Sequence, residues 1–339
     1  MLPGKLPPDI LARLLARLPA DPRVLLGPAI GRDAAAIDLG GGRVLIAKTD
    51  PVTFAVDQIG RYVVHVNAND IACLGARPSW FLATVLLPEG AAPELAEEIF
   101  EQIRSACAEL EVVPVGGHTE VTIGLDRPLV SGAMLGETTA EALVRPEAAQ
   151  AGDHVILTEG IAIEGTALLA REAPGALRAA GVPEETIAAA ARLLIEPGIS
   201  IVRDARAACR AARVHALHDP TEGGLATALR ELAEACGLQA RVRTADVPVL
   251  PETAAVCSAL GLDPLGLLAS GALLIAMGAA DCDVVREALA QEDISAACVG
   301  ELASGRRGDI MEFESRQPLP RFERDELARW FAAQQRAQG

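Results

Sequence analysis

The chain has 339 residues, of which 50% are hydrophobic and only 3% aromatic, and its formal net charge is -16 at pH 7. This length exceeds the usual size of a single hydrophobic core, so we expect two domains. The acidic surface and the scarcity of aromatic rings argue against binding to nucleic acids or to anionic membranes. No apolar run approaches the ~20 residues that cross a bilayer.

The cysteine pattern is typical of a reducing compartment. Seven cysteines are scattered along the chain without a CxxC pair, which favours unpaired structural thiols. The first residues lead into an arginine-containing amphipathic segment instead of the apolar core of a signal peptide. We therefore expect a soluble, cytoplasmic protein.

The first half of the chain alternates between strand-like and helix-like segments. We expect strands at 43–48, 80–87, 112–115 and 129–135, and helices at 59–74 and 94–110. A stretch rich in Pro, Gly and polar residues follows at 145–153, which indicates a domain boundary. We therefore assign residues 1–146 to one domain and 147–339 to a second.

A second α/β pattern follows the boundary. We expect strands at 154–157, 214–217, 272–277 and 297–302, and helices at 225–236 and 325–335. The last helix carries Leu327, Trp330 and Phe331, and we expect these residues to pack onto the second domain, with docking of a partner protein as the alternative. The whole pattern predicts an α/β fold.

Two aspartates follow apolar or glycine-containing segments in the first domain. Asp50 ends a predicted strand and precedes Pro51, which keeps the chain extended. A carboxylate at such a strand end points to the crevice where α/β sheets bind ligands, although an Asp beside Pro is also a common turn residue. Asp33, which follows Gly31 and Arg32, has the same two interpretations.

Asn67 and Asp70 lie on or near the apolar stripe of the predicted helix at 59–74. A carboxylate in that position needs a partner, a cap or a metal ion, because burying it alone costs several kcal/mol. The alternative is a boundary residue that reaches solvent. Taken alone, this helix does not decide between the two.

The most informative stretch is Gly116-Gly117-His118-Thr119-Glu120, directly behind an apolar strand. Paired glycines usually mark positive φ angles or a close approach of the backbone to a ligand. His118 and Glu120 are two residues apart and share one side of an extended segment, while a plain hairpin turn is the alternative. Together with the aspartates, the stretch suggests carboxylates that converge on one cation, most simply magnesium carrying a nucleotide.

A second polar junction precedes the predicted helix at 225–236. Asp219 as N-cap, Pro220 at the first helical position and Glu222 at the third would form a capping box without any chemistry. The pair Gly223-Gly224 then remains unexplained, because each glycine in a helix costs about 1 kcal/mol relative to Ala. Small residues at a helix N-terminus suit the approach of a phosphate, and both interpretations can hold together.

Five motifs in this order resemble the aminoimidazole ribonucleotide synthetase superfamily, which includes HypE, selenophosphate synthetase and thiamine monophosphate kinase. The resemblance covers nearly the whole chain and is greatest to the HypE-like branch. The motifs are Gly31-Arg32-Asp33-Ala34-Ala35, Thr49-Asp50-Pro51, Asn69-Asp70-Ile71-Ala72 with Gly75-Ala76-Arg77-Pro78, Gly116-Gly117-His118-Thr119-Glu120, and Asp219-Pro220-Thr221-Glu222-Gly223-Gly224-Leu225.

The resemblance implies a two-domain PurM-like α/β (α+β) fold, in which the N-terminal ATP-binding domains pair in a homodimer as a β-barrel. It also implies ATP and Mg²⁺ in a cleft near that pairing. The implied metal ligands are Asp33, Asp50, Asp70 and Glu120. The implied nucleotide site comprises Asp33, Asn67, Asn69, Asp70, Gly116, Gly117, Glu120, Thr221, Glu222, Gly223 and Gly224.

Asp50, His118 and Asp219 are the expected catalytic residues. Of the histidines in the motifs, His118 is the better candidate for a general base and His218 the next, since an imidazole titrates near neutral pH. No GxxxxGK[ST] loop is present, so phosphate charge would be neutralised by metal and backbone amides.

Two departures from the HypE pattern leave the acceptor open. HypE ends in a cysteine that carries the carbamoyl group, whereas Cys298 is the last cysteine here, and Glu222 stands where HypE-like sequences usually carry Arg. We expect an ATP- and Mg²⁺-dependent enzyme that phosphorylates or activates a carbonyl or amide oxygen, on a small molecule or a protein-borne group. The alternatives are a nucleotide-binding maturation or scaffold protein with a partner protein, and a small-molecule kinase resembling thiamine monophosphate kinase. A purine-pathway synthetase would need a phosphoribosyl site that the sequence does not reveal.

Overall fold

The computed structural model describes residues 6–29 and 31–338. They form two compact units, an amino-terminal unit of residues 20–27 and 33–143 and a carboxy-terminal unit of the remaining described residues. Residues 6–19 therefore group with the carboxy-terminal unit, whereas the sequence analysis places them in the first domain. Within the described residues, no helix has the length and apolar character needed to cross a membrane.

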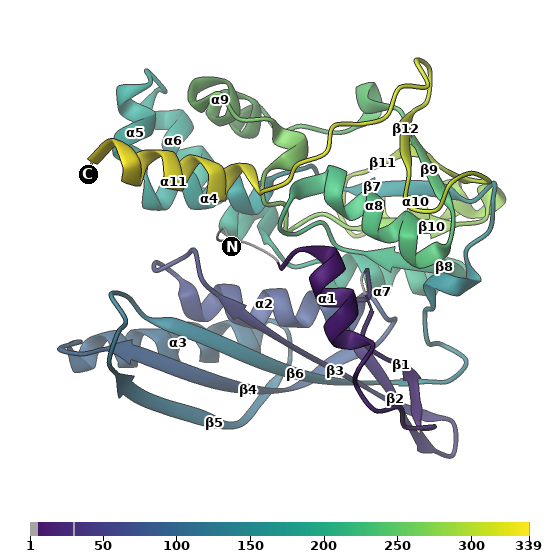
Figure 1. Ribbon diagram of the computed structural model, residues 1–339, viewed down its shortest axis with the longest axis horizontal. Coiled ribbons are helices and arrows are strands. Elements are labelled where there is room, and N and C mark those ends of the chain that lie inside the picture. Colours follow the sequence, from purple (N-terminus) through teal and green to yellow (C-terminus); the bar gives the residue numbers. More distant parts are fainter. Residues whose placement is uncertain (1–5, 30, 339) are drawn as a thin grey trace. The chain divides into compact units, whose positions relative to one another are not determined.

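The amino-terminal unit contains one six-stranded sheet in the order β1-β2-β3-β6-β4-β5 (Figure 1). Neighbouring strands are antiparallel except β4 and β5, which are parallel. Helix α2 packs on the sheet, and α3 packs on α2 and β5. The elements are β1 (Val24–Leu26), β2 (Ala35–Gly40), β3 (Arg43–Val52), α2 (Ile59–Ala72), β4 (Arg77–Pro88), α3 (Pro93–Glu109), β5 (Val113–Thr122) and β6 (Leu129–Thr139).

Two glycines of β6 allow α2 to lie close to the sheet. A Cβ atom on Gly132 would come within 2.6 Å of the Asn67 amide nitrogen, and one on Gly136 within 2.4 Å of the Ile71 side chain. Between them, Met134 is fully buried on the same face, as the alternation of β6 requires. Because these two β6 positions have no side chains, α2 packs close to the sheet and its residue Asn67 lies against the backbone of β6.

Strand β5 continues through the whole Gly116–Glu120 stretch, so the hairpin alternative was wrong. It is an edge strand, and every residue from Val113 to Val121 is exposed. Gly117 is explained by its neighbour strand, because an added Cβ would lie 1.9 Å from the carbonyl oxygen of Ala83 on β4. The close approach at this glycine is therefore to another strand of the same sheet.

The carboxy-terminal unit contains a second six-stranded sheet in the order β12-β9-β11-β7-β10-β8. Its strands are antiparallel except for the pair β12 and β9. Its elements are α1 (Pro8–Leu15), β7 (His154–Thr158), α4 (Ile163–Glu172), α5 (Pro174–Ala179), α6 (Glu184–Arg192), α7 (Val202–Ala211), β8 (Val214–His218), α8 (Gly224–Cys236), β9 (Gln239–Val242), α9 (Pro251–Leu260), β10 (Leu274–Met277), α10 (Cys282–Ala290), β11 (Ala296–Ala303), β12 (Ile310–Glu312) and α11 (Glu326–Gln338).

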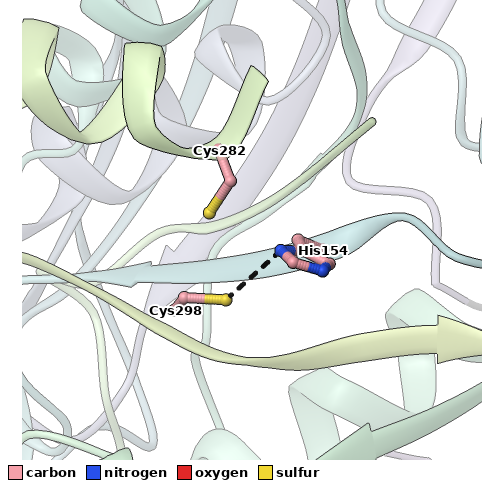
Figure 2. A group of neighbouring side chains, drawn as sticks. All are labelled: His154, Cys282 and Cys298. Atoms are coloured by element: carbon pink, nitrogen blue, oxygen red, sulfur yellow. Dashed lines mark hydrogen bonds between the residues drawn. The ribbon is translucent and has the colours of Figure 1, made fainter. Parts of the chain in front are cut away.

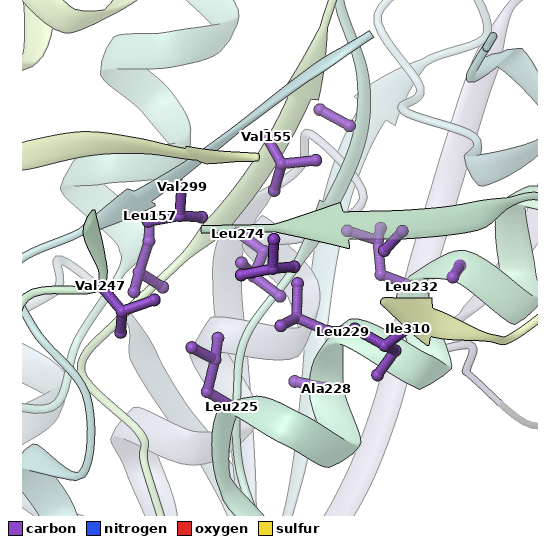
Figure 3. Packing of buried hydrophobic residues seen from close by; sticks show 14 of the residues in the cluster. Val155, Leu157, Leu225, Ala228, Leu229, Leu232, Val247, Leu274, Val299 and Ile310 are labelled. Carbon is purple, nitrogen blue, oxygen red and sulfur yellow. The ribbon is translucent and has the colours of Figure 1, made fainter. Parts of the chain in front are cut away.

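The two faces of this sheet are covered by different helices. Val155 and Leu157 of β7 and Leu274 of β10 pack against Leu225 and Leu229 of α8 in one apolar cluster (Figure 3). Residues of β7 alternate between faces, so His154 and Ile156 are directed to the opposite face. Helix α10 packs on β7 and β11 and buries Cys282 at its first position.

The start of α8 differs from the expected capping box. The helix begins at Gly224, its N-cap is Gly223 with φ 87°, and no side chain caps it, so Asp219 and Glu222 do not have the predicted capping roles. A Cβ on Gly223 would meet the Thr227 hydroxyl at 2.4 Å, and one on Gly224 the carbonyl oxygen of Leu265 at 2.5 Å. Positive φ angles and close packing therefore both require this glycine pair.

Helix α11 packs onto the carboxy-terminal unit. Leu327 and Trp330 are buried, and the Glu326 carboxylate accepts a hydrogen bond from the backbone N–H of Asp263 at 3.1 Å. The packing expectation for this helix is confirmed for Leu327 and Trp330, whereas Phe331 is half-buried.

Candidate active site

Lys48, Asp50 and Asp70 form a charged cluster in the amino-terminal unit. Lys48 and Asp50 are two residues apart on β3, so their side chains share one face of the strand, and Asp70 comes from α2. The Lys48 Nζ atom lies 3.2 Å from Asp50 Oδ2 and 3.1 Å from Asp70 Oδ2. Two of the three predicted aspartates are thus brought together around one positive charge.

Asn67 holds the backbone of Asp50 in place. The pairing of β3 with β2 ends at Ala47, so the main chain of Asp50 lacks a strand on that side. The Asn67 Oδ1 atom accepts a hydrogen bond from the Asp50 N–H at 2.8 Å, and its Nδ2 donates to the carbonyl oxygens of Asp50 and Val63. The Asn67 amide is therefore used by the main chain and acts by positioning Asp50.

The charge on Lys48 is stabilised by its neighbours. Burial alone would lower the pKa of Lys48, but the carboxylates of Asp70, Asp50 and Asp33 outweigh this effect and raise the pKa well above its ordinary value. Lys48 is therefore a permanent cation at neutral pH. Asp33 belongs to the same electrostatic group.

Asp70 is the buried member of the cluster. Its side chain is 7% exposed, compared with 45% for Asp50, so the alternative of a boundary residue that reaches solvent was wrong. Asn69, the neighbouring residue on α2, is fully buried. The sequence analysis missed Lys48, which the two-residue period of a strand and its spacing from Asp50 could have identified.

The Gly116–Glu120 stretch lies on the same sheet as Asp50 but presents His118 and Glu120 to the other face. One row across the sheet joins Asp50 to Gly132, then Ala83, then Gly117, a span of three strand spacings or roughly 14 Å. Paired residues in a row share a face, so His118 and Glu120 are directed away from the face that carries Asp50 and Asp70. Within one chain, they do not join the Lys48 cluster.

His118 and Glu120 share one side of an extended strand, as the sequence predicts, and their side chains contact each other. His118 Nε2 lies 3.1 Å from Glu120 Oε2, and both side chains are about half exposed or more. Gly117 and His118 border a groove of about 710 Å³ whose apolar lining includes Phe81 and Phe100. The edge strand thus carries a polar pair and borders an open, largely apolar groove.

In the carboxy-terminal unit, the segment Asp219–Gly224 follows directly after β8. His218, the last residue of that strand, is buried, and its Nε2 lies 3.2 Å from Glu231 Oε2. Asp219 is 1% exposed, while Thr221 and Glu222 are half-buried. His218 is thereby tied to a carboxylate and is not accessible as the general base that the sequence analysis ranked second.

Buried carboxyl groups surround the glycine pair of this segment. Asp325 Oδ2 accepts a hydrogen bond from the Gly223 N–H at 2.6 Å. Burial raises the pKa of Asp325 to about 6, and the nearby Glu222 adds to this effect. Burial likewise raises the pKa of Glu164 to about 7, with further contributions from Asp325 and Asp219. The segment therefore lies beside two buried carboxyl groups whose pKa values are raised above their ordinary values, and sequence reasoning identified neither Glu164 nor Asp325 as part of it.

Two family models match the chain. Residues 31–138 match the N-terminal domain of AIR synthase related proteins, and residues 150–312 match the C-terminal domain. A hydrogenase expression/formation protein of Methanocaldococcus jannaschii is 30% identical, with 83% of this chain and 82% of that protein covered. The protein belongs to the AIR synthase related family.

Several relatives within this family are named HypE. The carbamoyl dehydratase HypE of Cupriavidus necator is 30% identical and is covered over 72% of its length by 76% of this chain. A crystal structure of the hydrogenase maturation protein HypE in complex with ATP has a TM-score of 0.71 at 25% identity, with 94% of this chain and 96% of that chain covered. The resemblance inferred from the five motifs is therefore confirmed, and with it the two-domain PurM-like α/β fold.

Proposed function

We propose that this AIR synthase related protein is an ATP- and Mg²⁺-dependent enzyme that phosphorylates or activates a carbonyl or amide oxygen. The observation that carries the proposal is the convergence of Asp50 and Asp70 on one cation, the ammonium group of Lys48. Carboxylate oxygens are the ligands that Mg²⁺ prefers, so the donor set fits this metal. A HypE structure with the same fold was solved in complex with ATP, and this similarity supports nucleotide binding by the present protein.

In this proposal Asp33, Asp50 and Asp70 hold the metal ion, which would neutralise charge on the nucleotide phosphates when bound. Lys48 balances the carboxylates in the absence of a divalent cation, which explains how Asp70 can be buried and ionised. Asn67 sets the position of Asp50 through its main chain. The segment Asp219–Gly224 would contribute the small residues Gly223 and Gly224 beside the nucleotide, while their N–H groups donate to Asp325 and to the Thr221 carbonyl oxygen.

The acceptor is proposed from the relatives and from one residue of this chain. Relatives named carbamoyl dehydratase act on a carbamoyl group, which supports a carbonyl or amide oxygen as the acceptor, on a small molecule or on a protein. Glu222 adds negative charge beside Asp325, as its effect on that pKa indicates. An anionic acceptor would be repelled here, so we favour a neutral or cationic one.

Calorimetric titration of the whole chain with ATP, with and without Mg²⁺, tests the proposal. We expect about one Mg²⁺-dependent site per chain, and we expect Asp50→Asn to abolish ATP turnover while far-UV circular dichroism stays unchanged. Asp21→Asn is the matched control, because Asp21 is an aspartate of the same unit whose exposed side chain pairs with Arg23. Full activity of Asp50→Asn would sink the metal assignment, and no binding at millimolar ATP would favour the scaffold alternative.

We further propose that the protein forms a homodimer through β5. Val113, Val115 and Val121 of this edge strand and the nearby Ile123 are each more than half exposed. An exposed apolar edge strand is a template for pairing with another chain, and pairing would cover it. The polar pair His118 and Glu120 lies on the same strand, so dimerisation would bring it into the neighbourhood of a second copy.

Sedimentation equilibrium of the wild-type protein and of Val121→Lys tests the dimer. We expect the wild type to sediment as a dimer and the variant as a monomer, since a lysine on the paired edge would be buried without a partner. Val284→Lys is the control, because Val284 is similarly exposed but lies on α10. A monomeric wild type, or a Val121→Lys variant that remains dimeric, would contradict pairing through β5.

A further inference from the structure

Three potential metal ligands meet on the carboxy-terminal sheet, outside the proposed active site. His154 begins β7, Cys298 lies on the adjacent strand β11, and Cys282 is the first residue of α10. Their ligand atoms all lie within 4.8 Å of one another. Figure 2 shows the three side chains directed toward a common point, with the Cys298 sulfur 3.8 Å from His154 Nδ1.

Strand pairing and helix packing, and not side-chain rotamers alone, bring these three residues together. Cys298 pairs with Ile156, so it shares a face with His154, and a bulge in β11 follows directly after it. Helix α10 packs on the same two strands and places Cys282 over them. This face is opposite to the one that α8 covers, so the cluster is separate from the segment Asp219–Gly224.

The spacing and chemistry of the three groups match a thiophilic cation. Zinc–sulfur bonds of about 2.3 Å in tetrahedral geometry hold neighbouring donor atoms roughly 3.5 to 3.8 Å apart, so small side-chain movements would close the site. Thiolate and imidazole ligands select Zn²⁺ over Mg²⁺ or Ca²⁺. Cys282 is buried, whereas His154 and Cys298 are half-buried, which leaves one side of the cluster accessible to solvent.

We propose that His154, Cys282 and Cys298 bind one Zn²⁺ ion through two thiolates and one imidazole, with a water molecule as the fourth ligand. Binding converts both thiols to thiolates and releases two protons, so no oxidant or reductant is involved. Burial and the neighbouring Cys298 raise the pKa of the Cys282 thiol to about 12, so this thiol is a poor nucleophile without metal. The ion would tie β7, β11 and α10 together and is independent of the proposed ATP site.

The test uses the whole chain, reduced and freed of metal by a chelator. Zn²⁺ is titrated in competition with a chromophoric chelator, and Co²⁺ serves as a spectroscopic probe of the ligands. We expect one Zn²⁺ per chain, a thiolate-to-Co²⁺ charge-transfer band, and a loss of affinity of at least about 100-fold in Cys298→Ser and in His154→Gln. The control Cys209→Ser, which removes a half-buried thiol outside the cluster, should bind as the wild type does.

A second measurement requires no substitution. Zn²⁺ should protect Cys298 of the wild-type chain from alkylation by a maleimide, as located by mass spectrometry of peptides, whereas Cys209 should react equally with and without the metal. The proposal is overturned if the Co²⁺ complex lacks the charge-transfer band, if Cys298→Ser binds Zn²⁺ as tightly as the wild type, or if Zn²⁺ leaves the alkylation of Cys298 unchanged.

Discussion

Replacing Lys48 with methionine tests the charged cluster of the amino-terminal unit most directly. Methionine keeps the length of the side chain but removes its charge, which leaves Asp70 ionised and buried without its 3.1 Å partner. Breaking a buried ion pair by removing one partner costs about 3–5 kcal/mol. Lys48 is 20% exposed, so we expect the lower end of this range, about 3 kcal/mol.

Loss of the Lys48–Asp50 ion pair adds little to this decrease in the free energy of unfolding. Asp50 is 45% exposed, and an ion pair in such surroundings is worth less than about 1 kcal/mol. A total of about 3 kcal/mol corresponds to a decrease in melting temperature of roughly 10 °C for a domain of this size. Differential scanning calorimetry of the wild type and the variant measures it.

Magnesium should reverse the loss if the carboxylates form a cation site. A ligand that binds only the folded state at a hundred times its Kd contributes about 2.7 kcal/mol, which would restore most of the stability of Lys48→Met. In the wild type Mg²⁺ competes with the ammonium group, so its effect should be smaller. Potassium chloride at equal ionic strength separates specific binding from screening.

Arg43→Met is the matched control, because Arg43 lies on the same strand and forms an exposed ion pair with Glu137. It should lose less than about 1 kcal/mol and show no response to Mg²⁺. The reasoning is refuted if Lys48→Met is as stable as the wild type. It is also refuted if the variant is destabilised but Mg²⁺ restores nothing.

Asn67→Ala should destabilise the protein by about 1–3 kcal/mol in urea denaturation and weaken Mg²⁺-dependent ATP binding, because the main chain of Asp50 loses both partners; unchanged ATP affinity would contradict its positioning role. Glu164 has a pKa of about 7 instead of 4.5, so the folded state retains a proton that the unfolded chain loses, and stability falls as the pH rises from 4.5 to 7. Glu164→Gln should therefore flatten this dependence and gain up to about 3 kcal/mol at pH 8, and an unchanged pH profile would disprove the assignment. Gly132→Ala should cost about 1–3 kcal/mol, because its Cβ would lie 2.6 Å from Asn67, whereas Gly175→Ala, with no atom within 4 Å, should cost nothing.

Much of the local structure could be predicted from the sequence because it depends on neighbouring residues. The apolar period of the segment at 59–74 predicts α2, and the alternation at 129–135 predicts β6, although both strand and helix ends differ by a few residues. The capping box at Asp219 was the exception. The helix begins after Gly223 without a side-chain cap, and both Gly223 and Gly224 have positive φ angles. The contact of Gly224 with the backbone of Leu265 cannot be predicted from the sequence.

The candidate site was predicted in part. The order of the motifs identified the family, and Asp50 and Asp70 do converge on a cation. Which face of the sheet each residue occupies was not predictable, because it depends on the register of strands that are far apart in the chain. That register separates His118 and Glu120 from Asp50, and the sequence analysis had grouped them on one ligand.

The sequence by itself determined the family, the alternation of helices and strands and the identity of the chemically active residues, since these follow from local periodicity and from motif order. Only the tertiary structure decided which side chains meet. Lys48 and Asp50 lie on the same face of β3, and α2 packs closely on this face because Gly132 has no side chain. This packing places the charges of Lys48 and the buried Asp70 3.1 Å apart. His154, Cys282 and Cys298 lie far apart in the chain, and the pairing of β7 with β11 under α10 brings their ligand atoms within 4.8 Å.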